Sequence, residues 1–183
     1  MRPENIEEKI EIPKGINAAL DRNTLILKAD KGELKRKLLS KTVNFSIESN
    51  AVKLAANKPS KREKKIIGTF KVHIKNMIKG LTEGHVYKLK VCSSHFPMTV
   101  SVSNNEFIIK NFFGETSPRK LKITEGVEVK VEGEIITVNS INKEHAAQTA
   151  GSIENLTRRV NFDRRVYMDG IYITEKDGKE IKL

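Results

Sequence analysis

An internal repeat constrains the fold of this sequence more than any other feature. Residues 23–33 read NTLILKADKGE and residues 105–115 read NEFIIKNFFGE, at a constant offset of 82 positions. The Asn, Ile, Lys, Gly and Glu residues coincide in the two segments. Self-similarity of this kind indicates two copies of one supersecondary unit. The sequence therefore predicts duplicated modules.

The segments around each match also correspond in order. A proline, Pro13 or Pro97, precedes each match and interrupts strand pairing there. Residues 43–47 and 127–131 follow the matches and alternate apolar with polar side chains, which is the period of a half-buried strand. Residues 51–54 and 135–138, after short turns at 49–50 and 133–134, are the predicted partner strands. Each copy thus contains several antiparallel strands.

A helix is predicted to close each copy. In the first, Ser60 and Glu63 form a capping box, and Gly80 is the expected stop. Its apolar face comprises Ile66, Phe70, Ile74, Met77, Ile78 and Leu81. In the second, Asn142 is the expected cap, and the thinner apolar stripe comprises Ala146, Ala150, Ile153, Leu156 and Val160.

The predicted fold class is α+β, with two tandem copies of a small module. Each copy is an antiparallel sheet packed by one main helix. We place the first module at residues 1–82 and the second, with a basic C-terminal extension, at residues 83–183.

The charge of the chain points to a polyanionic partner. The sequence holds 34 Lys and Arg against 23 Asp and Glu, a net charge of +11. Residues 1–82 hold 19 basic and 9 acidic side chains, whereas residues 83–183 hold 15 and 14. A membrane partner would require a long apolar run or a basic amphipathic helix with bulky aromatics, and the sequence has neither. Nucleic acid is therefore the favoured partner, and no membrane partner is expected.

The sequence gives no positive support for catalysis, a metal or a cofactor. It lacks phosphate-binding glycine loops and the His-Glu-x-x-His motif. The single cysteine, Cys92, excludes an internal disulfide, and with His95 it makes only half of a zinc ligand set. We interpret Ser93, Ser94 and His95 as ordinary strand residues, because neighbouring side chains on a strand point to opposite faces. The N-terminus lacks the apolar segment of an export signal, so cytosolic residence is expected.

Local basic clusters are the candidate contacts. Two runs, residues 35–41 and 58–65, fit either phosphate contact or a solvated face. Four arginines, Arg158, Arg159, Arg164 and Arg165, present planar forks that hold phosphate, or form an ion-pair network with Asp163 and Glu154. Phe112 and Phe113 either stack on an unpaired base or pack in the core.

Three segments resemble a known family. Residues 164–176 (RRVYMDGIYITEK), residues 111–115 (NFFGE) followed by Arg119, and the early residues 11–13 (EIP) are similar to the L-six family of large-subunit ribosomal proteins, called L-nine in eukaryotes. The likeness is to the archaeal and eukaryotic branch and spans essentially the whole chain. Two positions depart from the pattern: Tyr167 replaces a common Phe, and Phe162 replaces a frequent basic residue.

The resemblance implies binding to large-subunit rRNA near the base of the ribosomal stalk and the sarcin–ricin region. The implied partners are rRNA and neighbouring ribosomal proteins, with translational GTPases nearby. The second module usually makes the main contacts in this family, so we expect local docking there and general attraction from the first. The predicted RNA-binding residues are Lys110, Asn111, Arg119, Lys120, Lys143, Arg158, Arg159, Arg164, Arg165, Tyr172 and Lys176.

Glycines and one aspartate are predicted to shape turns. Asp169 is expected to accept local backbone hydrogen bonds, and Gly170 to adopt a positive φ. Gly114 is the third predicted turn residue. Two rival interpretations remain: an RNA-binding assembly factor or regulator outside the ribosome, and a nucleic-acid-modifying enzyme, against which the missing motifs argue.

Overall fold

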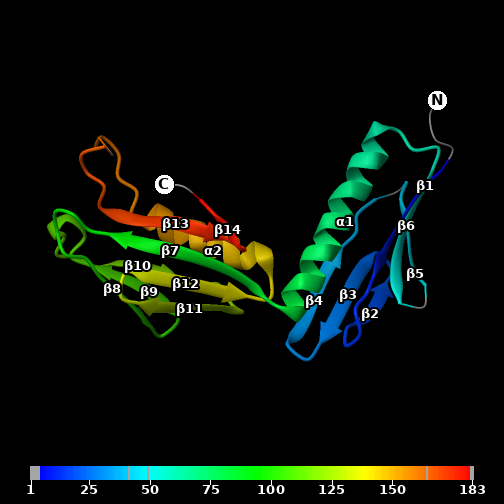
Figure 1. Cartoon of the computed structure of the whole chain (residues 1–183), viewed down its shortest axis with the longest axis horizontal. Coiled ribbons are helices and arrows are strands. Elements are labelled where there is room, and N and C mark those ends of the chain that lie inside the picture. The colour runs from blue at the N-terminus through cyan, green and yellow to red at the C-terminus, as the bar shows by residue number, and fades with distance from the viewer. Residues whose placement is uncertain (1–4, 41, 49, 164, 182–183) are drawn as a thin grey trace. The chain divides into compact units, whose positions relative to one another are not determined.

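The computed structural model of the chain describes residues 5–40, 42–48, 50–163 and 165–181 (Figure 1). The chain divides into two compact units, Met1–Gly84 and His85–Leu183. The division falls two residues beyond the sequence-based boundary after Thr82. Each unit has its own hydrophobic core.

The first unit packs one long helix with two small antiparallel sheets. One sheet has the order β2-β3-β4 and the other the order β1-β6-β5. The elements are β1 (Asn5–Glu11), β2 (Asn17–Asp21), β3 (Thr24–Ala29), β4 (Gly32–Lys37), β5 (Asn44–Glu48), β6 (Ala51–Asn57) and α1 (Lys61–Thr82). Leu27 of β3, Leu54 of β6 and Ile74 of α1 are fully buried, so both sheets and the helix contribute to one core.

The second unit repeats this arrangement and adds two strands. Its sheets have the orders β10-β9-β8 and β11-β12-β7-β13-β14. The elements are β7 (His85–Cys92), β8 (Thr99–Ser103), β9 (Glu106–Lys110), the 3₁₀ turn η1 (Phe112–Gly114), β10 (Arg119–Lys122), β11 (Val127–Glu132), β12 (Ile135–Ser140), α2 (Lys143–Leu156), β13 (Gly170–Lys176) and β14 (Lys179–Glu180). Figure 1 shows β13 lying beside β7.

Equivalent hydrogen bonds confirm the duplication. The carbonyl of Asn23 accepts from the Leu38 amide at 2.7 Å, and the carbonyl of Asn105 accepts from the Ile123 amide at 2.9 Å. In each unit, the asparagine carbonyl thus binds the amide that directly follows the last strand of the small sheet, β4 or β10. The predicted α+β fold with two repeated modules is therefore correct.

The predicted helix starts are confirmed, whereas the predicted stop of the first helix and one member of the second apolar stripe are wrong. The hydroxyl of Ser60 and the carboxylate of Glu63 form the capping box of α1, and Asn142 caps α2. Gly80 is buried inside α1, and the helix ends before Gly84, whose φ of +93° suits a glycine terminator. Val160 lies beyond the end of α2 and is 77 % exposed, so it is not part of the apolar stripe. No helix among the described residues has the length and apolar character needed to cross a bilayer.

Candidate RNA-binding surface

Five aromatic rings gather at one end of the second unit, where three loops meet. We call Phe96, Phe112, Phe113, Phe162 and Tyr167 the aromatic cluster. The Phe113 ring is central, with centroid distances of 5.0 Å to Phe112, 5.9 Å to Phe162 and 6.1 Å to Tyr167. Phe112 is buried, while Phe162 and Tyr167 are 39 % and 38 % exposed. The cluster therefore fastens the loops together and still presents ring surface to solvent.

Arg159 lies on this cluster. Its guanidinium carbon is 4.1 Å from the Phe162 ring centre and 4.6 Å from the Phe113 ring centre. Stacking on ring faces fixes a guanidinium in place while its edge N–H groups remain available to an anion. The Phe162 ring therefore supports the guanidinium of a neighbouring arginine.

Arg119 is engaged within the protein. Its guanidinium donates to both carboxylate oxygens of Glu115, at 2.8 and 2.6 Å, and to the carbonyl of Leu156 at the end of α2. It also lies 4.4 Å from the Phe112 ring centre. The hydrogen bonds from Arg119 lower the pKa of the Glu115 carboxyl against the opposing effect of burial. Arg119 thus stabilises the end of α2, and its guanidinium group is not free to bind a phosphate.

Arg158 and Arg165 lie on the loop after α2. Arg158 is exposed, and the side chain of Arg165 is 90 % exposed and pairs with Asp163 at 3.0 Å. Hydrogen bonds from Arg165 lower the pKa of the Asp163 carboxyl. The alternative of an ion pair with Asp163 is therefore present for Arg165. Glu154 instead accepts from the Ile173 amide at 3.3 Å. Arg164 lies outside the described residues.

Asp169 ties this loop to the segment after β7. It accepts hydrogen bonds from the amides of Ser94 and His95, at 2.5 and 2.9 Å, from the Ser94 hydroxyl at 3.1 Å, and contacts His95 Nδ1 at 2.6 Å. Burial opposes ionisation of Asp169, but these bonds outweigh it and hold the pKa of the carboxyl well below its ordinary value. Asp169 is therefore a long-range anchor, which corrects the prediction of local backbone bonds.

The Ser94–His95–Asp169 cluster does not have the order of a nucleophilic triad. The Ser94 hydroxyl and the Asp169 carboxylate both contact the same ring nitrogen, Nδ1 of His95. In a catalytic triad, the serine contacts one nitrogen of the imidazole ring and the acid contacts the other. These residues follow the end of β7 rather than lying on a strand, so the prediction of strand residues was wrong.

Gly170 lies in a closely packed position and does not have a positive φ. It begins β13, and a Cβ built there would lie 3.3 Å from the Tyr172 hydroxyl and 3.4 Å from Oγ1 of Thr157. The predicted left-handed turn at Gly170 is therefore wrong. Gly114 has a φ of +75° at the end of η1, in the left-handed region that favours glycine.

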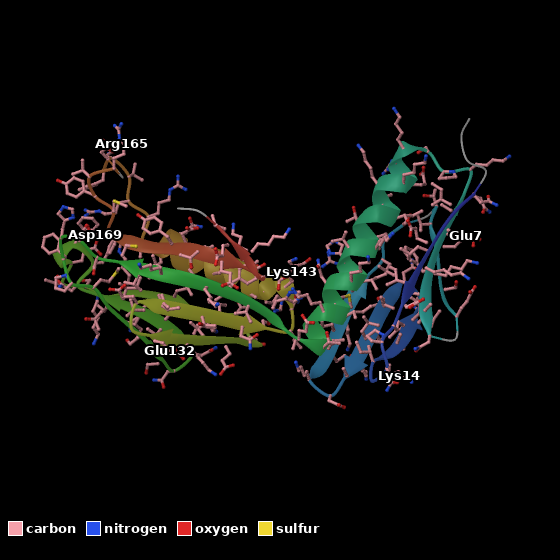
Figure 2. All side chains as sticks on the ribbon, in the orientation of Figure 1. Glu7, Lys14, Glu132, Lys143, Arg165 and Asp169 are labelled. Carbon is pink, nitrogen blue, oxygen red and sulfur yellow. The ribbon has the colours of Figure 1, made fainter. Side chains whose placement is uncertain are left out.

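The other predicted RNA-binding residues do not form one patch. Lys110 and Asn111 lie at the aromatic end, where Asn111 donates to the Pro97 carbonyl at 2.9 Å. Lys120 lies on β10, 3.8 Å from Glu106. Figure 2 shows Lys143 at one end of the unit, and Arg165 and Asp169 at the other end. Lys143 is 3.6 Å from Asp177, whose neighbour in sequence, Lys176, is exposed. Tyr172 lines a shallow hollow with Arg158, Arg159, Phe162 and Tyr167.

Sequence reasoning missed Ser94 and His95 as parts of this surface. They are 75 and 74 positions from Asp169, and no local pattern marks a contact of that range. Phe96 and Phe162, aromatic residues in otherwise polar loops, were the available signal.

In the first unit, the basic run at the start of α1 is solvent-exposed. Lys61, Arg62, Lys64 and Lys65 are exposed in its first turns. Cations are unfavourable at a helix N-terminus, so their position is not explained by helix stability. The charge of the other basic run, residues 35–41, is partly neutralised, because Glu33 pairs with Lys35 at 2.9 Å. Glu33 also pairs with Lys28 at 2.8 Å, and the two bonds lower the pKa of the Glu33 carboxyl. Lys41 lies outside the described residues.

Comparison with known proteins agrees with this two-unit structure. The family model described as Ribosomal protein L6 matches residues 12–84 and 96–170, one segment in each unit. A large ribosomal subunit protein uL6 from Methanococcus vannielii is 42 % identical over 174 residues, which cover 95 % of this chain and 96 % of that relative. A protein of the same name from Methanobrevibacter smithii is 41 % identical over 172 residues, covering 94 % and 97 %. The chain therefore belongs to the ribosomal protein L6 family, in its archaeal and eukaryotic branch.

Proposed function

We propose that this protein is a structural, non-enzymatic constituent of the large ribosomal subunit in the cytoplasm, where it binds large-subunit rRNA and neighbouring ribosomal proteins. Relatives that match nearly its whole length are named large ribosomal subunit proteins. The absence of nucleotide, metal and nucleophile motifs from the sequence agrees with a structural role.

The RNA-binding proposal rests mainly on the arginines beside the aromatic cluster. Arg158, Arg159 and Arg165 lie close in sequence on one loop, and Phe162 and Tyr167 present exposed ring surface next to them. Guanidinium groups hold phosphates through paired hydrogen bonds, and aromatic faces stack on unpaired bases. This combination suits a folded RNA with looped-out bases better than a uniform duplex.

The first unit contributes attraction without sequence selectivity. Residues 1–82 carry most of the net positive charge, and the exposed cations at the start of α1 concentrate it. Release of counterions from the RNA backbone makes such binding strong at low salt and weak at high salt. The first unit thus raises the affinity of the chain, and the second unit selects the site.

The RNA site that we propose is the base of the stalk, close to the sarcin–ricin region, with translational GTPases docking nearby. The resemblance of the C-terminal segment to the family supports this location. The aromatic end of the second unit, including Tyr172 and Lys110, is the part of the chain that we expect to approach this RNA.

A charge reversal in the loop after α2 tests the RNA-binding surface. Arg158→Glu should weaken binding of the full chain to large-subunit rRNA by about tenfold and lower the slope of log affinity against log salt by about 1. The matched control is Lys130→Glu, which reverses an exposed charge of the same unit on β11. Equal losses in the two variants would show that the loop is not the contact surface.

Directed cleavage of the RNA tests the location. An iron chelate attached to the thiol of Val166→Cys, an exposed position on the same loop, in a chain that also carries Cys92→Ser, should cut the sarcin–ricin region in isolated large subunits. Cuts confined to distant rRNA would refute the proposed location. An assembly factor, the rival function, would be absent from mature subunits altogether.

A further inference from the structure

The two units differ at one sheet edge. In the second unit, β7 is paired on both sides, with β12 and with β13. In the first unit, the equivalent strand β1 pairs with β6, and among the described residues no strand pairs with its other side. The pairing of β13 with β7 therefore shows how an added strand could pair with the open edge of β1.

Matching hydrogen bonds fix the correspondence between the strands. The Ile12 amide donates to the Asn50 carbonyl at 2.9 Å, and the Val91 amide donates to the Glu134 carbonyl at 2.7 Å. Ile12 thus corresponds to Val91, and by the same count Lys9 corresponds to Lys88. Backbone groups alternate in direction along an antiparallel strand, so Glu7, Lys9 and Glu11 direct their N–H and C=O groups to the open edge.

In the second unit, the corresponding backbone groups are used by β13. The Val86 carbonyl accepts from the Asp177 amide at 2.9 Å, and the Lys88 carbonyl accepts from the Thr174 hydroxyl at 3.2 Å. Ile171 and Ile173 of β13 are buried in the core. The amide of Ile171 also donates to the Thr157 hydroxyl at 3.0 Å, so α2 holds the added strand from its other side.

A groove occupies the corresponding place in the first unit, between β1 and α1. Its apolar floor includes Ile10 and Ile78, and its other lining residues are Lys9, Glu11, Lys71, Lys75, Lys79, Thr82 and Glu83. Four of these residues are cationic and two are anionic, so the groove has a positive balance. An apolar floor, an open strand edge and cationic walls together match an extended peptide that carries acidic side chains.

We propose that the β1 edge binds an extended segment of a neighbouring protein, added antiparallel as a fourth strand of the β1-β6-β5 sheet. Alternate apolar residues of the segment face the groove, as Ile171 and Ile173 do in the second unit. Acidic residues of the segment approach Lys75, because Lys71 already pairs with Glu8 at 2.7 Å. An RNA strand would use only the lysines, whereas a peptide strand also satisfies the open backbone groups, which is why a peptide is the favoured occupant.

Proline substitutions test which backbone groups are in use. Lys9→Pro removes an N–H that points to the open edge, so the melting temperature of the free protein should change little. Lys88→Pro removes the corresponding N–H that faces β13, and it should lower the melting temperature clearly. Lys9→Ala is the control for loss of the Lys9 side chain and its 3.7 Å ion pair with Glu48.

Binding is measured with a synthetic peptide in which isoleucine alternates with threonine, flanked by glutamates. On the full chain, we expect the peptide to protect the Glu7, Lys9 and Glu11 amides from hydrogen exchange. Lys9→Pro should weaken binding at least tenfold, and Lys9→Ala should weaken it much less. If Lys9→Pro does not fold, the exchange of these three amides in the unaltered chain decides the question.

Three results would overturn this proposal. The first is that the peptide binds but leaves the three amides unprotected, or binds Lys9→Pro as tightly as the unaltered chain. The second is that the peptide does not bind at all. The third is protection of the same amides by self-association, or occupation of the groove by an oligouridine probe in preference to the peptide. None of these results bears on the RNA surface of the second unit, so the two proposals fail independently.

Discussion

Replacing Asp169 by alanine should destabilise the second unit strongly. The change removes a buried carboxylate that contacts two amides, one hydroxyl and one imidazole nitrogen of Ser94 and His95. Hydrogen bonds to charged groups contribute about 1.5–3 kcal/mol each, and exposed Ser94 and His95 recover part of this from water. We expect a loss of about 2–4 kcal/mol in the free energy of unfolding, or a melting temperature about 10 °C lower or more.

Thermal denaturation followed by circular dichroism measures this effect. Asp169→Asn keeps a carbonyl oxygen for the two amides and should lose less than Asp169→Ala. Asp163→Ala removes an exposed carboxylate from the same loop and should leave the melting temperature nearly unchanged. Equal melting temperatures for Asp169→Ala and the unaltered chain would refute the role of Asp169 as an anchor.

The pH dependence of stability follows from the same group. Because the folded pKa of Asp169 lies below its unfolded value, ionised Asp169 stabilises the fold. This contribution is fully present above the unfolded pKa of about 4 and is lost as the pH falls through the folded pKa. The stability difference between the unaltered chain and Asp169→Asn should therefore narrow below about pH 4. A constant difference down to the most acidic conditions would contradict this reasoning.

Four further substitutions are checked by denaturant unfolding. Gly170→Ala places a methyl group 3.3 Å from the Tyr172 hydroxyl and should cost about 1–2 kcal/mol, whereas Gly151→Ala in α2 meets open space and should gain about 0.5–1 kcal/mol. Ser60→Ala removes the N-cap of α1 and should cost about 1 kcal/mol. Arg119→Ala removes the brace at the end of α2 and should cost about 2 kcal/mol, with RNA affinity reduced no more than for Lys130→Glu. A stabilising Gly170→Ala, or neutral changes at Ser60 and Arg119, would contradict these assignments.

The sequence predicted the features of the fold that depend on local pattern. The repeat around Asn23 and Asn105, the alternating strands and the two helix caps were all readable, because each depends on residues close in sequence. The helix ends were not. Gly80 looks like a terminator, yet the buried face of α1 continues to Leu81, and packing outweighs the poor helix propensity of one glycine.

The candidate site was less predictable because it depends on contacts between loops. The arginines after α2 were found from composition, but nothing local distinguishes exposed Arg158 from Arg119, whose partners are Glu115 and the end of α2. Likewise, Asp169 and Gly170 look like a turn pair, and only the folded chain shows their partners Ser94, His95 and Tyr172.

Sedimentation of cell extract through a high-salt gradient tests whether this protein is a constituent of the mature large subunit. The protein is detected across the free, small-subunit and large-subunit fractions. We expect one copy per large subunit after the salt wash, and lower retention of Arg158→Glu than of Lys130→Glu. A peak confined to the free or precursor fractions would contradict a role as a constituent of the mature subunit and would favour an assembly factor.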